Sequence, residues 1–381
     1  MQKLQFNANG KFTIMQVSDV QDIGGLLPRT QELYLSALDR VNPDFVVFTG
    51  DQLKGYGLKA QVATQDQRER RMMQTLTALA APLELRGIPF TITFGNHDHD
   101  VPMHPLTQFE RWQLWSNCMV KHSDGVPGFA NHVLEVADSQ GDFPAMLLYF
   151  LDSHGPNGFG YTPLDPGQIA WYKDMRDTYA AQNNGKVISS MLFQHVPVEE
   201  MYRLFKPVEK KTPGALEGFR NYKGKYFVLD EDKVAPGSFM GELPSSPDEN
   251  AGLFEAAMEK GDMLGMFFGH DHNNGFHGKV DGIALGYAPA AGYTAYGPGR
   301  KRGVRVFHFD ENDLTNFESY VLTDEQLLHQ PLSARVKLQD AGPSSWGEAA
   351  QMLRRNLPKV GIGAAGVALS VAAVKLLRKK K

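Results

Sequence analysis

Short apolar runs alternate with longer amphipathic stretches over the first two-thirds of the chain, and this rhythm limits the folds available to it. Most runs are rich in β-branched or aromatic residues and end at Gly, Asp or His, as strands do. Because they are nearly continuous in apolarity, we expect strands covered on both faces. The runs occupy residues 12–17, 45–49, 90–94, 146–151, 188–193 and 263–268.

Helix-like patterns separate these runs, at residues 30–41, 65–86, 106–117, 166–181 and 247–260. Strands that alternate with helices predict an α/β domain built in layers. Residues 207–246 break the rhythm, and we expect an excursion that borders a pocket. From residue 277 to 322 the pattern favours antiparallel strands that close a sheet.

Composition excludes several classes of protein. Hydrophobic residues make up 42% and charged residues 22%, which argues against a disordered chain. The single cysteine, Cys118, excludes a disulfide framework and a Cys-rich zinc module, and it fits a reducing compartment. The net charge of -4 excludes a generally basic nucleic-acid-binding protein. The first residues show no secretory signal, so we expect a cytoplasmic protein.

Side chains of the kinds that bind metals follow five of the predicted strands. Because strand ends of an α/β sheet converge at one edge, we expect these side chains to meet. They are Asp19 and Gln21 in SDVQD, Asp51 in TGDQ, Asn96 and His97 in FGNHDHD, His195 in LFQHVP, and His270 and His272 in FFGHDH.

The ligand types indicate which metals would bind. Carboxylates, imidazoles and an amide oxygen suit Mn, Fe or Zn better than Ca. Two ions need about this many ligands if a carboxylate bridges them, and such a pair can bind phosphate and generate hydroxide. Gly50, Gly95 and Gly269 each precede a ligand segment, where the lack of a Cβ allows a sharp turn and a close approach.

These motifs carry a resemblance to a known family. Asp-x-Gln, Gly-Asp, Gly-Asn-His-Asp, a lone His and Gly-His-x-His, in this order, resemble the calcineurin-like metallophosphoesterase superfamily. LLYFLDSHG, QIAWY, GHDHNNGF and GYTAYGPGRKRGVRVF resemble its purple-acid-phosphatase-29-like branch. The resemblance spans roughly residues 10–322. It implies an α/β (α+β) fold, a four-layer αββα sandwich of two mixed β-sheets flanked by helices.

The resemblance also implies roles for the site residues. Asp51 would bridge two metal ions. His97 would bind no metal; it would face the substrate and help to protonate the leaving oxygen. One ion would be completed by Asp19, His272 and Gln21, and the other by Asn96, His195 and His270.

The sequence departs from the family pattern at two positions. The first motif usually reads Asp-x-His, and Gln21, a weaker ligand than imidazole, takes the place of that His. Gln21 either binds an ion or donates a hydrogen bond to a metal-bound water. Purple acid phosphatases carry a tyrosine three residues after the bridging aspartate; Lys54 stands there, so no purple colour is expected.

Other interpretations of single residues remain open from the sequence. His97 could be a surface histidine, and His195 could be a core histidine whose hydrogen bonds are satisfied within the protein. Arg300 and Arg302, with Lys301 between them, could attract a phosphorylated substrate, or they could form a solvated turn. The sequence lacks the metallo-β-lactamase motif, a Gly-x-Ser-x-Gly elbow and a P-loop.

The C-terminal tail differs from the rest of the chain. From residue 351 onward it holds eight basic residues and no acidic ones, which leaves 31 basic and 43 acidic residues, a net charge of -12, in the remainder. Residues 360–374 carry no charge. We expect this segment to lie on the cytoplasmic face of a membrane, attracted by anionic lipids. The alternatives are a helix packed on the body and a flexible end.

The sequence thus predicts a dinuclear metal-dependent phosphoesterase that hydrolyses phosphate esters, monoesters or diesters, through a metal-bridging hydroxide. The alternative is a non-catalytic metal-binding scaffold or interaction protein of the same fold, weakened at Gln21. We expect a catalytic domain over residues 1–322 with 207–246 inserted, a linker over 323–350 and the tail over 351–381.

Overall fold

The computed structural model describes residues 3–55, 64–158 and 160–340. It contains two compact units, Met1–Leu332 and Ser333–Lys381. In the second unit the described residues form helix α8 (Ala334–Asp340). Residues 323–332, which the sequence assigned to a linker, belong to the first unit. The tail over 351–381 lies outside the described residues.

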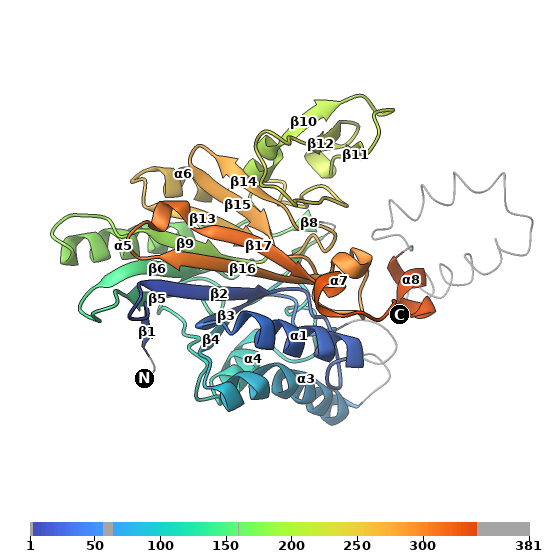
Figure 1. Ribbon diagram of the computed structural model, residues 1–381, viewed down its shortest axis with the longest axis horizontal. Coiled ribbons are helices and arrows are strands. Elements are labelled where there is room, and N and C mark those ends of the chain that lie inside the picture. Colours follow the sequence, from blue (N-terminus) through green and yellow to red (C-terminus); the bar gives the residue numbers. More distant parts are fainter. Residues whose placement is uncertain (1–2, 56–63, 159, 341–381) are drawn as a thin grey trace, which may run out of the picture. The chain divides into compact units, whose positions relative to one another are not determined.

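One sheet of the first unit has five strands among the described residues, in the order β17-β16-β2-β3-β4 (Figure 1). Strands β2, β3 and β4 run parallel, whereas β16 is antiparallel to both β2 and β17, so the sheet is mixed. The bounds are β2 (Lys11–Val17), β3 (Phe45–Thr49), β4 (Phe90–Thr93), β16 (Gly303–Asp310) and β17 (Glu318–Thr323).

The second sheet has seven described strands, in the order β1-β5-β6-β9-β13-β15-β14. Its central strands β6, β9, β13 and β15 are parallel; β5 pairs antiparallel to β6 and parallel to β1, and β14 pairs antiparallel to β15. The bounds are β1 (Leu4–Gln5), β5 (His132–Ala137), β6 (Pro144–Phe150), β9 (Ser190–Phe193), β13 (Met263–Phe268), β14 (His277–Val280) and β15 (Ile283–Tyr287).

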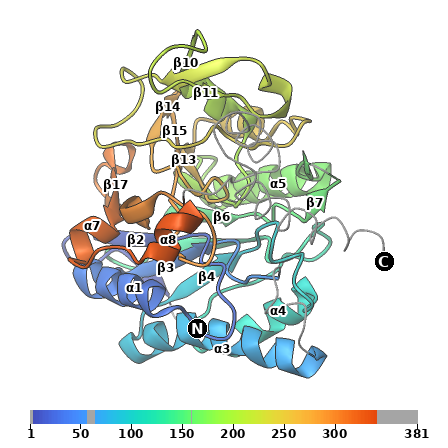
Figure 2. The ribbon, with the colours of Figure 1, turned by 90° about the vertical axis from the view of Figure 1, so that its right-hand side faces the viewer.

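Alternating side chains explain why both sheets are buried on both faces. Phe45 and Val47 of β3 belong to the apolar cluster between the sheets, whereas Val46 and Phe48 belong to the cluster beneath the helices. Figure 2 shows these helices on the outer side of β2, β3 and β4. They are α1 (Pro28–Val41), α3 (Gln65–Arg86) and α4 (Pro105–Trp112).

The seven-stranded sheet is covered in the same way. Phe267 of β13 packs between the sheets, and its neighbours Met266 and Phe268 pack in the outer cluster with residues of α5 (Pro166–Gln182) and α6 (Leu253–Met258). Two mixed sheets between two helical layers give the predicted αββα sandwich, so the predicted fold class is confirmed.

Several predicted boundaries need correction. Helix α6 begins at Leu253 rather than at residue 247, because Gly252 before it has a left-handed φ of 83°. Helix α4 ends at Trp112 and does not reach residue 117. The excursion over 207–246 includes most of a small antiparallel sheet, which the sequence did not indicate. Its strands are β10 (Phe205–Val208), β11 (Leu216–Glu217) and β12 (Tyr226–Leu229).

Smaller elements complete the first unit. They are the hairpin of β7 (Pro156–Asn157) and β8 (Gly160–Tyr161), helix α7 (Asp324–Leu327), and the 3-10 turns Glu199–Leu204, Arg220–Tyr222, Gly299–Lys301 and Leu314–Asn316. Within the described ranges, no helix combines the length and apolarity needed to cross a membrane.

Candidate metal centre

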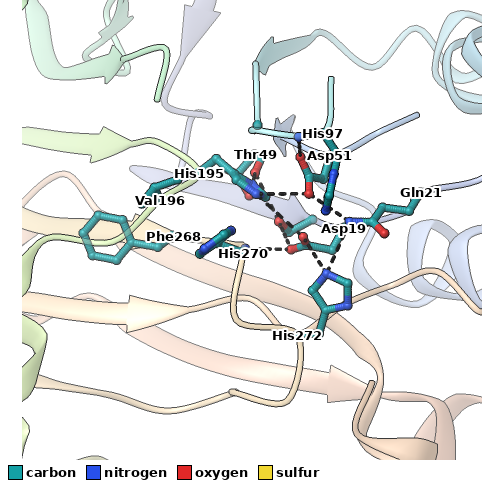
Figure 3. Close-up of polar contacts among 12 residues, drawn as sticks. Asp19, Gln21, Thr49, Asp51, His97, His195, Val196, Phe268, His270 and His272 are labelled. Atoms are coloured by element: carbon teal, nitrogen blue, oxygen red, sulfur yellow. Dashed lines mark hydrogen bonds and ion pairs between the residues drawn. The ribbon is translucent and has the colours of Figure 1, made fainter. Parts of the chain in front are cut away.

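The predicted ligands follow parallel strands of both sheets. Asp19 follows β2, Asp51 follows β3, and Asn96 follows β4 of the five-stranded sheet. His195 follows β9 and His270 follows β13 of the other sheet. Figure 3 shows side chains from these loops turned toward one another. Backbone contacts join the two sheets here, since the amide of His270 donates to Oδ2 of Asp19 over 2.9 Å.

Two buried carboxylates form the middle of the site. Oδ1 of Asp19 lies 3.2 Å from Nε2 of His272, and Oδ2 of Asp51 lies 3.3 Å from Nε2 of His195. Ligand atoms of Asp19, Asp51 and His272 all lie within 4.8 Å of one another. Two carboxylates at this separation, both shielded from water, repel each other unless positive charge lies between them. The group is therefore able to hold a metal ion.

Four buried ligand atoms make no hydrogen bond among the described residues, although two of them, Oδ1 of Asp19 and Nε2 of His195, face an ionisable group at 3.2 and 3.3 Å. A buried polar atom without a partner costs about 1–3 kcal/mol, so a cluster of them indicates that something else binds there. The atoms are Oδ1 of Asp19, Oδ1 of Asn96, Nε2 of His195 and Nε2 of His270. Carboxylate, amide and imidazole atoms of this kind fit a transition metal, so the residues present match the predicted ligand set.

Hydrogen bonds orient two of the histidine rings. Nδ1 of His195 donates to the carbonyl oxygen of Thr49 over 2.8 Å, and Nδ1 of His272 donates to that of Tyr296, also over 2.8 Å. With the proton on Nδ1, the lone pair of Nε2 faces the centre, which is the tautomer that a metal ligand needs. The ring of His270 meets that of His195 at 72°, with 5.1 Å between centroids.

The backbone at the centre is strained. Asp19, Gln21, Asp51 and His270 have φ values of 52°, 45°, 52° and 74°, in the left-handed region that residues other than glycine rarely adopt. Each such residue costs about 1–3 kcal/mol, and these conformations concentrate at functional sites. These backbone conformations turn the chain sharply at the strand ends, so that the side chains point toward one another.

The predicted role of the glycines as close-approach positions agrees with this geometry. A Cβ on Gly269 would lie 1.8 Å from Oγ of Ser18, and one on Gly95 would lie 2.2 Å from Oδ1 of Asp51. Neither distance is possible between real atoms. The glycines therefore make room for the ligand side chains and their hydrogen-bond partners.

The carboxylates and histidines of the site lie so close together that they shift one another's pKa values. Burial by itself raises the pKa of both carboxyls, but facing histidines, chiefly His272 for Asp19 and His195 for Asp51, lower each pKa overall. Burial lowers the pKa of His195, but Asp51 and Asp19 outweigh it and raise that pKa to about 10. Burial, with His195 nearby, lowers the pKa of His270 to about 3. A proton on His195 thus balances the carboxylates in the metal-free chain, and a cation would compete with it.

His97 lies at the edge of the cluster. Its backbone amide donates to Oδ1 of Asp51 over 2.8 Å, and its side chain is 33% exposed, with Nδ1 3.1 Å from Oδ2 of Asp100. Burial lowers the pKa of His97, but Asp51 and Asp100 raise it overall. The partial exposure leaves the ring accessible to a molecule outside the protein, in contrast to the buried His195.

Gln21 is fully buried beside the carboxylates. Its amide nitrogen donates to Oδ2 of Asp51 over 2.8 Å and lies 3.4 Å from Nε2 of His272. The nitrogen rather than the oxygen faces Asp51, as expected for an amide next to an anion.

The two arginines proposed to bind substrate need correction. Arg302 is fully buried, and its guanidinium donates to the carbonyl oxygens of Gly292 and Ala295 over 2.7 and 2.8 Å. Nε of Arg300 donates to Oδ1 of the buried Asp324 over 2.9 Å. Arg302 holds the loop before β16 in place, and Arg300 ties that loop to α7, so these contacts engage both arginines within the protein.

Sequence reasoning missed several residues around the ligands. Oγ of Ser18 donates to Oδ2 of Asp19 over 2.6 Å, and the carboxylate of Asp98 accepts from the amides of Asp51 and Gly95. The ring of Tyr296 stacks on His272 at 4.3 Å, and the ring of Tyr161 meets the edge of His270 at 4.3 Å. Asp98 is part of the Gly-Asn-His-Asp motif and could have been found; no spacing marks the two tyrosines.

The sequence of residues 12–274 matches the family model of the calcineurin-like phosphoesterases. The chain belongs to this family, which confirms the resemblance drawn from the motifs.

Proteins from several organisms are similar to this chain. Probable inactive purple acid phosphatase 29 of Arabidopsis thaliana is 27% identical, over 81% of this chain and 79% of the relative. Phosphatase DCR2 of Saccharomyces cerevisiae is 28% identical, over 56% of this chain and 39% of the relative. Among solved structures, a dimetal phosphatase from Danio rerio matches with a TM-score of 0.46 and 13% identity, over 82% of this chain and 98% of that one.

Proposed function

We propose that the protein is a dinuclear metal-dependent phosphoesterase. The observation that carries this proposal is the set of buried ligand atoms that make no hydrogen bond, above all Oδ1 of Asn96 and Nε2 of His270. Asn96, His195 and His270 follow three strands of two different sheets, and Figure 3 shows His195 and His270 near the carboxylates of Asp19 and Asp51. A structural cluster would have paired these atoms within the protein, because leaving them unpaired destabilises the fold.

The contacts of Asp51 support the proposed ligand sets. Asp51 contacts residues of both sets, since its Oδ2 lies 2.8 Å from the Gln21 amide and 3.3 Å from His195. Asp19 and His272 would hold one ion, and Asn96, His195 and His270 the other. Two bound ions, of Mn, Fe or Zn, would polarise a phosphate ester and lower the pKa of a water molecule.

The half-exposed His97 would contact the substrate rather than a metal. Its backbone is fixed by Asp51 and its ring by Asp100, so the imidazole is held next to the centre. From there it would bind the phosphoryl group and donate a proton to the leaving oxygen, a role that typically contributes a factor of about 10²–10⁴ in rate.

Phosphate release tests this proposal. Purified protein should be loaded with Mn, Fe or Zn and assayed with an aryl phosphate monoester and a diester. We expect hydrolysis, and His97→Ala should lower kcat about 100-fold or more while metal content stays unchanged. The exposed His329 provides a matched control, and His329→Ala should keep full activity. A metal-loaded protein that hydrolyses neither ester would contradict the proposal.

A second candidate, a non-catalytic metal-binding scaffold, is favoured by one specific observation. Gln21 replaces an imidazole with an amide whose nitrogen faces Asp51, which weakens the ligand set of one ion. The word "inactive" in the name of the Arabidopsis relative points in the same direction. Metal binding without hydrolysis, and no effect of His97→Ala on any measured property, would favour the scaffold.

We also propose a division into a catalytic body and a basic tail that binds anionic membranes on the cytoplasmic side. Eight basic residues and no acidic ones after residue 350 support this proposal. Cells expressing the full chain and a chain ending at residue 347 should be fractionated. We expect only the full chain in the membrane fraction; equal amounts of both in the soluble fraction would exclude membrane binding by the tail.

A further inference from the structure

A pocket of about 610 Å³ lies against the edge strands of the two sheets. It is lined by residues of β14, the edge strand of the seven-stranded sheet, and of β17, the edge strand of the five-stranded sheet. None of the predicted metal ligands lines it. The volume falls within the range of about 300–1,000 Å³ that small-molecule sites occupy.

A buried cation without a counter-ion faces this cavity. Arg305 of β16 lines it, yet the residue is fully buried, and among the described residues no carboxylate pairs with its guanidinium. Nε donates to the carbonyl oxygen of Tyr287 over 2.7 Å, and Nη1 donates to Oγ of Ser319 over 2.8 Å. Nη2 has no partner in the described part of the chain. Burying a charge in this way is costly unless an anion compensates it.

The charge on Arg305 persists at neutral pH. Burial lowers its pKa to about 9, which still leaves the guanidinium protonated at pH 7. The neighbouring His277 is neutral, because burial and the charge of Arg305 lower its pKa to about 3. The cavity therefore holds a permanent positive charge, which lies 5.5 Å from the centre of the Phe267 ring and has no carboxylate paired with it among the described residues.

The neighbours of Arg305 present further donors. Nη1 of Arg305 lies 3.2 Å from Nδ1 of His277, and since a guanidinium only donates, Nδ1 must accept and the imidazole proton sits on Nε2. By the same logic the hydroxyl of Ser319 accepts from Arg305 and keeps its own proton to donate. Lys301 also lines the cavity, with its ammonium 4.9 Å from the ring centre of Phe239.

We propose that this cavity binds a small organic anion, with a phosphate or carboxylate group on Arg305 and Lys301. Donors dominate the polar lining, and the acidic side chain on it is that of Glu325. Phe239, Tyr320 and Val321 line the remainder, so the ligand has an apolar part as well. The site is separate from the metal centre, and the inference does not depend on the proposed phosphoesterase activity.

Titration calorimetry on the full chain, freed of metal by a chelator, tests this site. Without metal the catalytic centre presents carboxylates and does not attract anions. The probes are phenyl phosphate, benzoate and inorganic phosphate. We expect saturable binding of phenyl phosphate or benzoate, tighter than that of inorganic phosphate because the ring is buried. Failure of all three probes to bind would overturn the proposal.

Substitutions of residues that line the cavity test whether the probes bind there. Lys301→Ala should weaken binding about threefold, and Arg305→Lys should weaken it about tenfold or more, since a charge-assisted hydrogen bond is lost. Glu325→Gln should tighten binding, because a repelling charge is removed. Lys279→Ala is the matched control, an exposed lysine of β14 outside the cavity, and should change nothing.

Thermal unfolding verifies that each variant is folded. Lys301 and Glu325 are exposed, so their variants keep the test decisive even if Arg305→Lys does not fold. Affinities for phenyl phosphate and benzoate that are the same in wild type, Lys301→Ala and Glu325→Gln would contradict the proposal.

Discussion

The side-chain amide of Gln21 donates a 2.8 Å hydrogen bond to the same oxygen of Asp51, Oδ2, that lies 3.3 Å from Nε2 of His195. An amide N–H therefore occupies a lone pair of the carboxylate that we propose as the bridge between two ions. From this contact we expect that, of the two proposed ions, the one on the side of Gln21 is bound more weakly.

The variant Gln21→His should bind that ion more tightly. Imidazole is a better ligand than an amide for Mn, Fe or Zn, so we expect the affinity of the weaker site to rise about tenfold, or ~1.4 kcal/mol. Competition with a fluorescent chelator measures this affinity. Gln21→Ala is the control for side-chain removal and should show no gain. Equal affinities in wild type and Gln21→His would contradict the assignment.

The close approach at Gly269 makes a prediction about stability. Gly269→Ala would place a Cβ 1.8 Å from Oγ of Ser18, so we expect a loss of about 3 kcal/mol or more in the free energy of unfolding. Ser18→Ala removes the oxygen of the closest contact and leaves Oδ2 of Asp19 at 2.8 Å, so the double variant should recover part of the loss and be more stable than the sum of the single effects by about 1 kcal/mol. Urea unfolding of the four proteins measures the coupling, and strict additivity would show that the clash is not the cause.

Stability should depend on pH through His132, which is buried away from the metal centre. Its ring nitrogens lie 2.7 Å from the carbonyl oxygen of Ala130 and 2.8 Å from Oγ1 of Thr91. Burial lowers the pKa of His132 to about 3 from its ordinary value of 6.5. Between these values the unfolded chain binds a proton that the folded chain does not, so this contribution is full above pH 6.5 and is lost as the pH falls toward 3.

The variant His132→Gln tests this dependence. The drop in the free energy of unfolding from pH 7 to about pH 4.5 should be smaller in the variant by about 2 kcal/mol. Denaturant unfolding at the two pH values measures it. If wild type and variant lose the same stability on acidification, His132 is not the group responsible.

The buried carboxylate of Asp324 should stabilise the C-terminal part of the first unit. It accepts two hydrogen bonds from Arg29, of 2.7 and 2.8 Å, and one from Arg300. Asp324→Asn leaves two arginines without their counter-ion, and we expect a loss of about 3 kcal/mol. The control is Asp310→Asn, whose partner Lys11 is 55% exposed and which should cost under about 1 kcal/mol. Thermal unfolding that shows equal losses would contradict the structural role of Asp324.

The positions of the candidate ligands could be predicted from the sequence because each follows a strand that is buried on both faces. Uninterrupted apolar runs such as β3 and β13 can be recognised without an alignment, and the polar residue after each run marks the edge of the sheet. The αββα layering follows from the same runs, since side chains of β3 alternate between two apolar clusters.

The remainder depended on contacts distant in sequence. The basic run at residues 300–302 looked solvated, but Arg302 is buried against carbonyl oxygens that no local pattern reveals. Strand β5 has two partly exposed positions, and its interrupted pattern concealed it. Tyr161 and Tyr296 contact the ligand histidines from separate loops, so only the folded chain brings them to the site.

The central claim is that the side chains around Asp51 bind two metal ions. Elemental analysis of the purified chain after equilibration with Mn, Fe or Zn tests it most directly, with Asp51→Asn measured in parallel. We expect about two ions per chain in the wild type, and a clear loss in the variant because both ions would share that carboxylate. Trace metal in the wild type, or the same content in both proteins, would contradict it.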